Sequence, residues 1–159
     1  MDATTETTSV VREVEIDASP ETVWEVLVDP DKAVRWMGER ATFDPRPGGA
    51  WQIDVIPGNT AAGEFIELDP PHRLVYTFGW VSTRMDENAV PLDSSTIEIE
   101  LTPDGDGTRL RFTHGDLPSD ASAESHGHGW DHYLERLEIA AGGGDPGEDP
   151  WLTGPMSSA

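Results

Sequence analysis

The chain has 159 residues, which is enough for one domain with a substantial core. It carries 31 Asp and Glu against 10 Lys and Arg, giving a formal net charge of −21. Such a surface lacks the basic groups that bind nucleic acid or anionic lipid headgroups, so neither is an expected partner. The absence of cysteine excludes disulfides and thiolate chemistry. No apolar run approaches the roughly 20 residues that span a bilayer, so no membrane insertion is expected.

The acidic residues are spread over the whole chain, and Lys32 is the only lysine. This pattern is typical of a protein surface adapted to high salt, because the Debye length falls to about 3 Å near 1 M salt and surface carboxylates then repel one another weakly. An ordinary acidic protein from a moderate environment is the alternative. Residues 1–9 lack the basic start and apolar segment of a signal peptide, so we expect a disordered N-terminus there and a cytoplasmic protein.

A strand and two short helices are predicted at the start of the domain. Residues 9–17 alternate in polarity, which predicts a strand with Arg12 on its inward side. Ser19 can cap a helix that has Pro20 at its first position. A second short helix is predicted over 31–36. The helix pair is expected to close one end of a sheet.

Further strands follow, separated by turn signals rich in Gly, Pro and Asp. The predicted strands are 41–45, 50–56, 62–68, 73–80, 95–101 and 108–114. Each has an apolar and a polar face, which is typical of an antiparallel sheet covered on one side. If the alternation is unbroken, Glu67 faces inward with Phe65. It could then form a buried ion pair with Arg12 that orients a polar ligand or holds strands together.

Residues 124–141 carry apolar side chains at steps of three and four, which predicts one long amphipathic helix. The apolar face holds His126, Trp130, Tyr133, Leu137 and Ala140, and the opposite, wet face holds Glu124, His128, Asp131, Glu135 and Glu138. Gly127 and Gly129 predict close approach of the helix to the sheet, with a frayed first turn as the alternative. Three glycines end the helix, and 142–159 is expected to be a flexible acidic tail rich in Gly and Pro.

Aromatic side chains gather on the predicted inward faces of the sheet and the helix. They are Trp51, Phe65, Tyr76, Phe78, Trp80, Phe112, Trp130 and Tyr133. Each ring alone is typical of core packing, but together such large rigid rings beneath a helix indicate a ligand cavity. His114 and His126 also face inward and are expected to meet at the cavity mouth. They are either hydrogen-bonded structural histidines or groups that act as a base or as a donor to a ligand carbonyl.

A metal site is not expected. His128 and His132 are four residues apart, as two zinc ligands on one helix face can be, but no third ligand and no general-base glutamate follow at a recognisable spacing. No nucleophile stands beside a base, and the sequence has neither a phosphate loop nor a dinucleotide fingerprint. No cofactor is therefore expected.

Five segments of the chain occur in the order found in a known family. They are SPETVWEVLVDP, PGGAWQIDV, GEFIELDPPHRLVYTFGW, GDGTRLRFTHGDLP and HGHGWDHYLERLEIA. The set resembles the START-like (SRPBCC) superfamily and is similar to its activator of heat-shock-protein-90 ATPase homologue family, over roughly residues 10–141. The resemblance implies an α+β helix-grip fold. In this fold a curved antiparallel sheet of about six to seven strands wraps around the long C-terminal helix, with two short helices after the first strand and a cavity between.

The resemblance also implies a protein that binds a small apolar or aromatic molecule in that cavity, lined by the eight aromatic residues with His114 and His126. One alternative is a cyclase- or hydrolase-like enzyme that uses His114, Tyr76 or His126 as acid–base groups. Another is a stress-related, co-chaperone-like module that binds proteins, and a homodimer is left open. Chaperone-activating members carry an extra N-terminal domain that is not among these residues, so chaperone activation is not expected.

Overall fold

The structure is a computed structural model that describes residues 8–38, 40–56, 59–80, 95–117 and 120–147. Seven strands and three helices occur in these ranges. In chain order they are β1 (Thr8–Ile16), α1 (Pro20–Val28), α2 (Pro30–Ala33), β2 (Arg40–Phe43), β3 (Ala50–Ile56), β4 (Asn59–Asp69), β5 (Arg73–Trp80), β6 (Ser95–Asp104), β7 (Gly107–Leu117) and α3 (Asp120–Ala141). Every predicted strand corresponds to an observed strand, and β3 and β5 have the predicted bounds.

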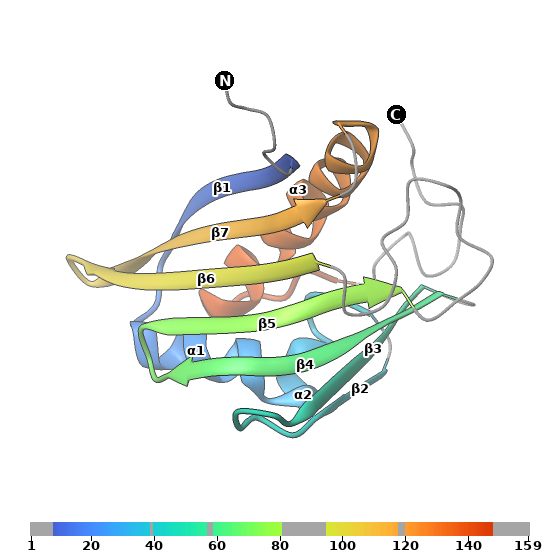
Figure 1. Ribbon diagram of the computed structural model, residues 1–159. Coiled ribbons are helices and arrows are strands. Elements are labelled where there is room, and N and C mark those ends of the chain that lie inside the picture. Colours follow the sequence, from blue (N-terminus) through green and yellow to red (C-terminus); the bar gives the residue numbers. More distant parts are fainter. Residues whose placement is uncertain (1–7, 39, 57–58, 81–94, 118–119, 148–159) are drawn as a thin grey trace.

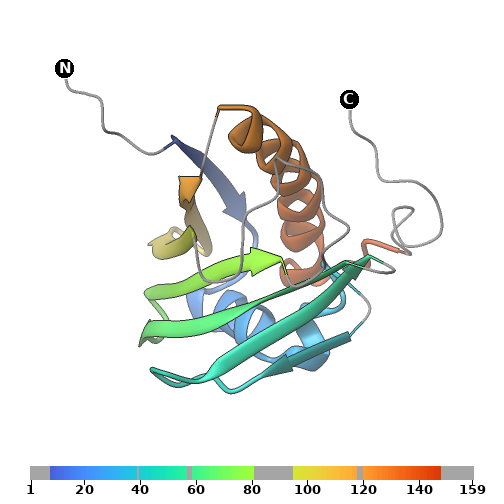
Figure 2. The same ribbon diagram turned by 45° about the vertical axis from the view of Figure 1, so that its right-hand side comes forward.

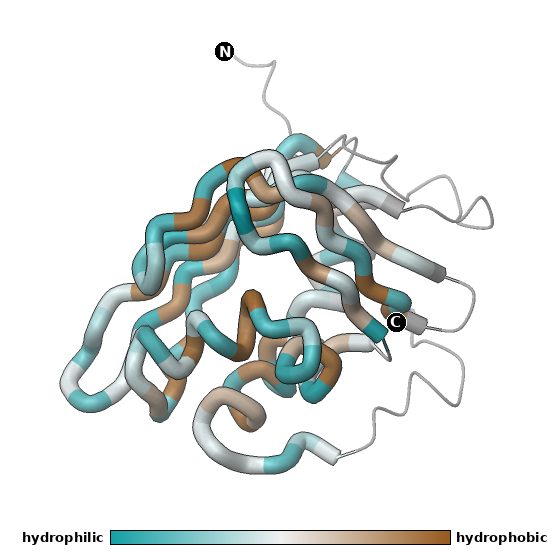
Figure 3. The backbone as a smooth tube through the Cα atoms, turned by 90° about the horizontal axis from the view of Figure 1, so that it is seen from below, coloured by the Kyte–Doolittle hydropathy of each residue, from teal (hydrophilic) through white to brown (hydrophobic). Residues whose placement is uncertain are grey.

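The strands form a single antiparallel sheet in the order β1-β7-β6-β5-β4-β3-β2. Strands β2 to β7 follow one another as a meander, and β1 pairs with β7 at the opposite edge from β2. The sheet curves around the three helices, which lie on its concave side (Figure 1 and Figure 2). Hydrophobic and hydrophilic residues alternate along the strands (Figure 3). This arrangement confirms the predicted α+β helix-grip fold.

Polar N-cap side chains determine where the two short helices begin. The Ser19 side chain accepts a hydrogen bond of 3.2 Å from the backbone N–H of Thr22, and Pro20 takes the first helical position, as predicted. Asp29 ends α1 and caps α2 by accepting from the N–H of Asp31 at 3.0 Å. The second helix therefore begins at Pro30, earlier than predicted. Beyond Ala33 the chain continues in turns that carry two large side chains toward the sheet, those of Trp36 and Met37.

A β-bulge in β4 overturns one prediction. Phe65 pairs with Tyr76 but Glu67 pairs with Val75, so the register shifts by one residue between them. The extra residue reverses which side chains face inward beyond Phe65. Glu67 consequently lies on the outer face with a 49% exposed side chain and pairs with Arg73 at 3.3 Å. The predicted Arg12–Glu67 ion pair is therefore wrong.

Arg12 instead joins β1 to α3. Its Nε donates to Oδ1 of Asp131 at 2.6 Å. Gly127 on the same helix allows this approach, since a Cβ there would lie only 2.9 Å from Nη2 of Arg12. The predicted close approach is thus observed at Gly127. The helix begins at Asp120, four residues before the predicted start, and His128, predicted on the wet face, is half-buried.

A second bulge lies at the end of β7. Val10 pairs with His114 and Thr8 pairs with Leu117, so both Gly115 and Asp116 lie opposite one residue of β1. Asp116 adopts a left-handed conformation with φ of 63°. Because of this bulge, Leu117 turns back into the core, where it is buried.

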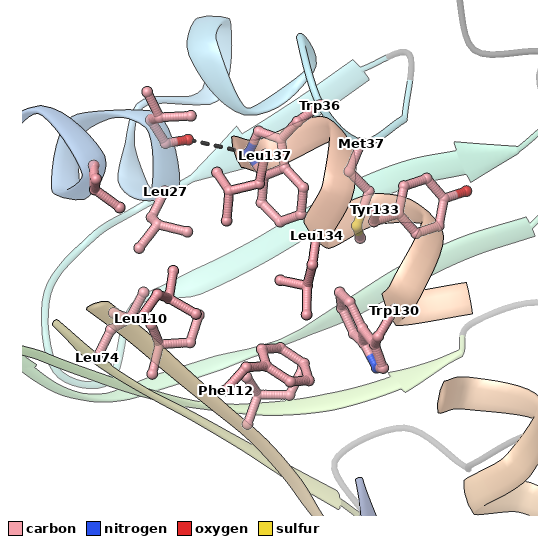
Figure 4. Close-up of a cluster of buried hydrophobic side chains, with 14 of the residues drawn as sticks. Leu27, Trp36, Met37, Leu74, Leu110, Phe112, Trp130, Tyr133, Leu134 and Leu137 are labelled. Carbon is pink, nitrogen blue, oxygen red and sulfur yellow. Dashed lines mark hydrogen bonds between the residues drawn. The ribbon is translucent and has the colours of Figure 1, made fainter. Parts of the chain in front are cut away.

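The core lies between α3 and the sheet. Leu134 and Leu137 of α3 pack with Leu74, Leu110 and Phe112 of the sheet and with side chains from the α1–α2 region (Figure 4). All of these side chains are buried. The one long helix therefore supplies most of the helical cover, as its amphipathic spacing predicted.

Buried Arg136 ties three segments together through backbone carbonyls. Its Nε donates to the carbonyl of Trp36 at 3.1 Å, and its Nη2 donates to that of Arg35 at 3.2 Å. The same guanidinium donates to the carbonyls of Pro146 at 3.3 Å and Gly147 at 2.9 Å. The first residues of the predicted tail, up to Gly147, are thus linked through Arg136 of α3 to the turn that follows α2. The remainder of that tail lies outside the described residues.

Candidate functional site

An aromatic layer lies between the α1–α2 region and the β2–β5 half of the sheet. It surrounds a small cavity that is lined, on the side opposite the sheet, by Leu27 of α1, Trp36 and Met37 of the turn after α2, and Trp130 of α3. The sheet wall is Phe43, Trp51, Ile53, Phe65, Leu74, Tyr76 and Phe78. The cavity volume is about 20 Å³, far below the roughly 300–1,000 Å³ of ordinary ligand sites. The sequence predicts a ligand-sized cavity, but the side chains that line this space pack closely enough to leave only this small volume.

The rings of the sheet wall pack in defined pairs. Trp51 meets Tyr76 edge-on with ring centroids 5.2 Å apart, and it stacks on Phe78 at 5.7 Å. Phe65 meets Tyr76 at 6.0 Å in a second edge contact. Aromatic pairs at such separations stabilise one another beyond simple burial. The sheet wall is therefore a single interlocked surface.

Trp51 reaches across a neighbouring strand to hold its position. Its Nε1 on β3 donates to the carbonyl of Thr77 on β5 at 2.8 Å, passing over Gly63 of β4. The hydroxyl of Thr77 accepts from the N–H of Glu64 at 2.9 Å. A Cβ at Gly63 would lie 2.0 Å from the Thr77 carbonyl oxygen and 2.6 Å from Trp51 Nε1. Glycine is therefore required beneath this indole.

A chain of buried hydrogen bonds runs behind the cavity. Trp130 Nε1 on α3 donates to Nδ1 of His114 on β7 at 3.0 Å. Nε2 of the same histidine lies 2.8 Å from Oγ of Ser95 on β6, and Ser95 donates to the carbonyl of Phe78 at 2.7 Å. His114 is 0% exposed. The network joins α3 to three adjacent strands.

This network determines the tautomer of His114. An indole N–H can only donate, so Nδ1 of His114 must accept from Trp130 and the proton of the neutral imidazole lies on Nε2. Nε2 then donates to Ser95, whose own proton goes to Phe78. Both nitrogens of His114 are thus occupied.

The surroundings of His114 keep it neutral. Burial, and to a smaller extent the nearby His126, lower the pKa of His114 from 6.5 to about 3. The two imidazole rings are 5.4 Å apart and perpendicular. These histidines therefore meet, but not at the predicted cavity mouth, because neither belongs to the cavity lining. Although Ser95 stands beside His114, the imidazole carries its proton on the side facing the hydroxyl. It therefore cannot act as the base that would activate Ser95 as a nucleophile.

The predicted site residues fall into three groups. Those that line the cavity are Trp51, Phe65, Tyr76, Phe78 and Trp130. Those placed outside its lining are Phe112, His114 and Tyr133, which are buried, and His126, which is half-buried. The side chain of Trp80 lies outside the described part of the structure.

Sequence reasoning missed two features of the site. It did not include the wall supplied by Leu27, Trp36 and Met37, because no periodic pattern links the α1–α2 turns to the sheet. It also overlooked Ser95, although the alternation with Ile97 in the same strand places both on the inward face. That alternation was a usable signal.

Comparisons with known proteins agree with this geometry. The curved sheet around a long C-terminal helix is the fold of the START-like (SRPBCC) superfamily. Residues 17–142 match the family model described as Activator of Hsp90 ATPase homolog 1-like protein, and the chain belongs to that family. No curated protein matches the sequence significantly. Within the described residues, no helix combines the length and apolar character needed to cross a membrane.

Solved structures resemble the chain over most of its length. The AHSA1-like protein of Rhizobium etli is 42% identical over 96% of this chain and 92% of that chain, with a TM-score of 0.72. The Aha1 dimer of Colwellia psychrerythraea is 20% identical over 86% of this chain and 99% of that chain, with a TM-score of 0.69. DynU16, a putative protein in the dynemicin biosynthetic locus, is 21% identical over 87% of this chain, with a TM-score of 0.73. The match spans only 48% of DynU16, so the chain corresponds to about half of that protein. The last two likenesses concern the fold alone.

Proposed function

We propose that this protein binds one small, flat apolar molecule in the aromatic layer between the α1–α2 region and the sheet. The observation that supports this most directly is the lining of the cavity. Seven of its eleven residues are aromatic and the other four are aliphatic or Met. Such a surface favours aromatic ligands through stacking and edge contacts.

Binding requires the layer to open, because the cavity volume is only about 20 Å³. Met37 is the side chain best able to move, since an unbranched thioether changes rotamer at low cost. It belongs to the turn beyond α2 rather than to the sheet, so its displacement leaves the strand pairing intact. For scale, an engineered apolar cavity of about 150 Å³ is large enough for benzene.

The alternatives receive less support. Acid–base catalysis by His114 is disfavoured because its two nitrogens are occupied and it is fully buried. A protein-binding module would favour a continuous apolar surface. Among the described residues, the exposed large hydrophobic side chains are Val11, Ile66 and Ile139, which lie on three different elements.

The proposal is tested with a neutral fluorophore, N-phenyl-naphthylamine, titrated into the protein while tryptophan emission is followed. We expect saturable binding of one molecule per chain. Met37→Ala should bind about three- to tenfold more tightly, because the variant starts with a larger cavity. Ile66→Ala is the matched control, since it truncates an apolar side chain on the outer face and should bind like the wild type. If neither the wild type nor Met37→Ala binds the probe, the proposed function is wrong.

A further inference from the structure

Most side-chain hydrogen-bond donors in the cavity wall already donate to another protein group. Four described residues of the cavity wall carry a side-chain hydrogen-bonding group, and three of these are tryptophans. Trp36 donates to the carbonyl of Val26 at 3.3 Å. Trp51 donates to the carbonyl of Thr77, and Trp130 donates to His114. Since an indole has a single N–H and no acceptor, all three are saturated.

Tyr76 is the fourth. Its ring is fixed by edge contacts with Trp51 and Phe65, and the side chain is half-buried in the cavity wall. Within the described part of the chain, its hydroxyl makes no hydrogen bond. Burial also raises the pKa of Tyr76, so the phenol keeps its proton and remains a donor. A fixed, protonated and unused donor is thus built into an otherwise apolar wall.

The polar network behind the layer cannot serve a ligand in its place. His114 is occupied on both nitrogens, and the proton of Ser95 is given to the carbonyl of Phe78. A ligand that entered the layer would therefore find one free side-chain donor among the described wall residues. In apolar sites, one or two such polar groups fix the orientation of the ligand and decide which ligand is accepted.

We infer that the Tyr76 hydroxyl is the specificity-determining contact of the site and that the ligand is an aromatic ketone or a related flat molecule with a carbonyl oxygen. The inference rests on the proposed binding of an apolar molecule in this layer. The ring system would lie against Trp51 and Phe65, and the carbonyl oxygen would accept from the phenol. A ligand without an acceptor would leave the donor as it is in the free protein, so it gains only the apolar contacts.

Two fluorescent probes separate these contributions. One is prodan, a dimethylamino-naphthalene that carries a propionyl ketone, and the other is the same dimethylamino-naphthalene without the ketone. We expect Tyr76→Phe to weaken prodan binding about three- to tenfold, the range for one neutral hydrogen bond. Its effect on the ketone-free probe should stay within about twofold. Emission of bound prodan should also shift to shorter wavelength in Tyr76→Phe, because a hydrogen bond to the carbonyl shifts it to longer wavelength.

Tyr133→Phe is the matched control, because the sequence contains 2 tyrosines and Tyr133 is not part of the cavity wall. It should bind both probes like the wild type, with unchanged prodan emission. If the wild type binds neither probe, the proposed function itself fails. If both probes bind but Tyr76→Phe weakens them equally, or changes neither affinity nor emission, the function stands and the role of Tyr76 is wrong.

Discussion

The indole N–H of Trp130 on α3 donates to Nδ1 of His114 on β7 across the centre of the core, at 3.0 Å. Both side chains are buried, with Trp130 4% and His114 0% exposed. The contact gives the long helix a directional link to the sheet in addition to its apolar packing. It also determines the tautomer of His114, and through it the orientation of Ser95.

Removing this donor should cost stability out of proportion to the lost volume. Trp130→Phe keeps an aromatic ring but leaves Nδ1 of His114 buried without its partner, at a cost of about 1–3 kcal/mol in the free energy of unfolding. Trp130→Ala should cost about 3–5 kcal/mol, because it also creates a cavity. Urea denaturation measures both. A loss below about 0.5 kcal/mol in Trp130→Phe would show that the hydrogen bond contributes little.

His114 should make stability depend on pH. Its pKa lies at about 3 in the folded protein against 6.5 ordinarily, so between these values the unfolded chain binds the proton and the folded chain does not. The contribution of neutral His114 to the free energy of unfolding is therefore fully present above pH 6.5. It is lost as the pH falls toward 3, by up to about 1.4 kcal/mol per pH unit.

The carboxylates titrate in the same window, so the measurement compares the wild type with His114→Gln. The glutamine amide does not titrate. Between pH 6.5 and 4.5, the free energy of unfolding should therefore fall less steeply with pH in this variant, by a slope that corresponds to the binding of about one proton. NMR of the His114 ring supplies a direct check. A ring that titrates near its ordinary pKa would contradict the buried neutral histidine.

Gly63 should not tolerate a side chain. A methyl group there would meet the Thr77 carbonyl and the Trp51 indole, and the strand cannot move without breaking the contact between them. We expect Gly63→Ala to lower the free energy of unfolding by about 2–3 kcal/mol. Gly115→Ala is the control, because nothing lies within 4 Å of a Cβ at that strand position. Equal losses in the two variants would refute the steric argument.

Salt should raise the melting temperature. In the described part of the chain, ion pairs to carboxylates are formed by Arg12, Lys32, Arg40, Arg46, Arg73, Arg109 and Arg111. The carboxylates that remain in excess repel one another, and molar KCl screens this repulsion. We expect Tm to increase from low to molar KCl at pH 7, with a smaller increase at pH 4.5, where part of the carboxylate charge is neutralised. A Tm that is flat or falls at pH 7 would end the interpretation of the sequence as high-salt adapted.

The strands and the cap of α1 were predictable because their causes are local. Alternation and turn signals predicted the first and last residues of β3 and β5, and Ser19 with Pro20 indicated the start of α1. The bulge after Phe65 was not predictable, since nothing in the local pattern distinguishes an inserted residue from a continuing strand. Glu67 was misplaced for that reason.

The aromatic composition of the site was predictable, but its volume was not. Five of the predicted residues line the cavity, because the alternation of polarity along a strand indicates which side chains face inward. How completely rings fill a space depends on rotamers and on contacts between distant segments, such as Met37 against the sheet wall. The inward position of Ser95 was predictable from alternation, but the direction of its hydrogen bonds was not, because it depends on Trp130 on a different element.

The hydrogen bonds by which Arg136 joins three segments, here called the Arg136 joint, all go to the main chain. Its guanidinium meets carbonyls of Arg35, Trp36, Pro146 and Gly147, which every amino acid supplies equally. Exchanges among its exposed neighbours at the surface therefore leave the joint intact, whereas Lys in place of Arg136 would lose the planar fork that spans all four oxygens. Substitutions are thus tolerated at the exposed neighbours of this joint and penalised at Arg136 itself.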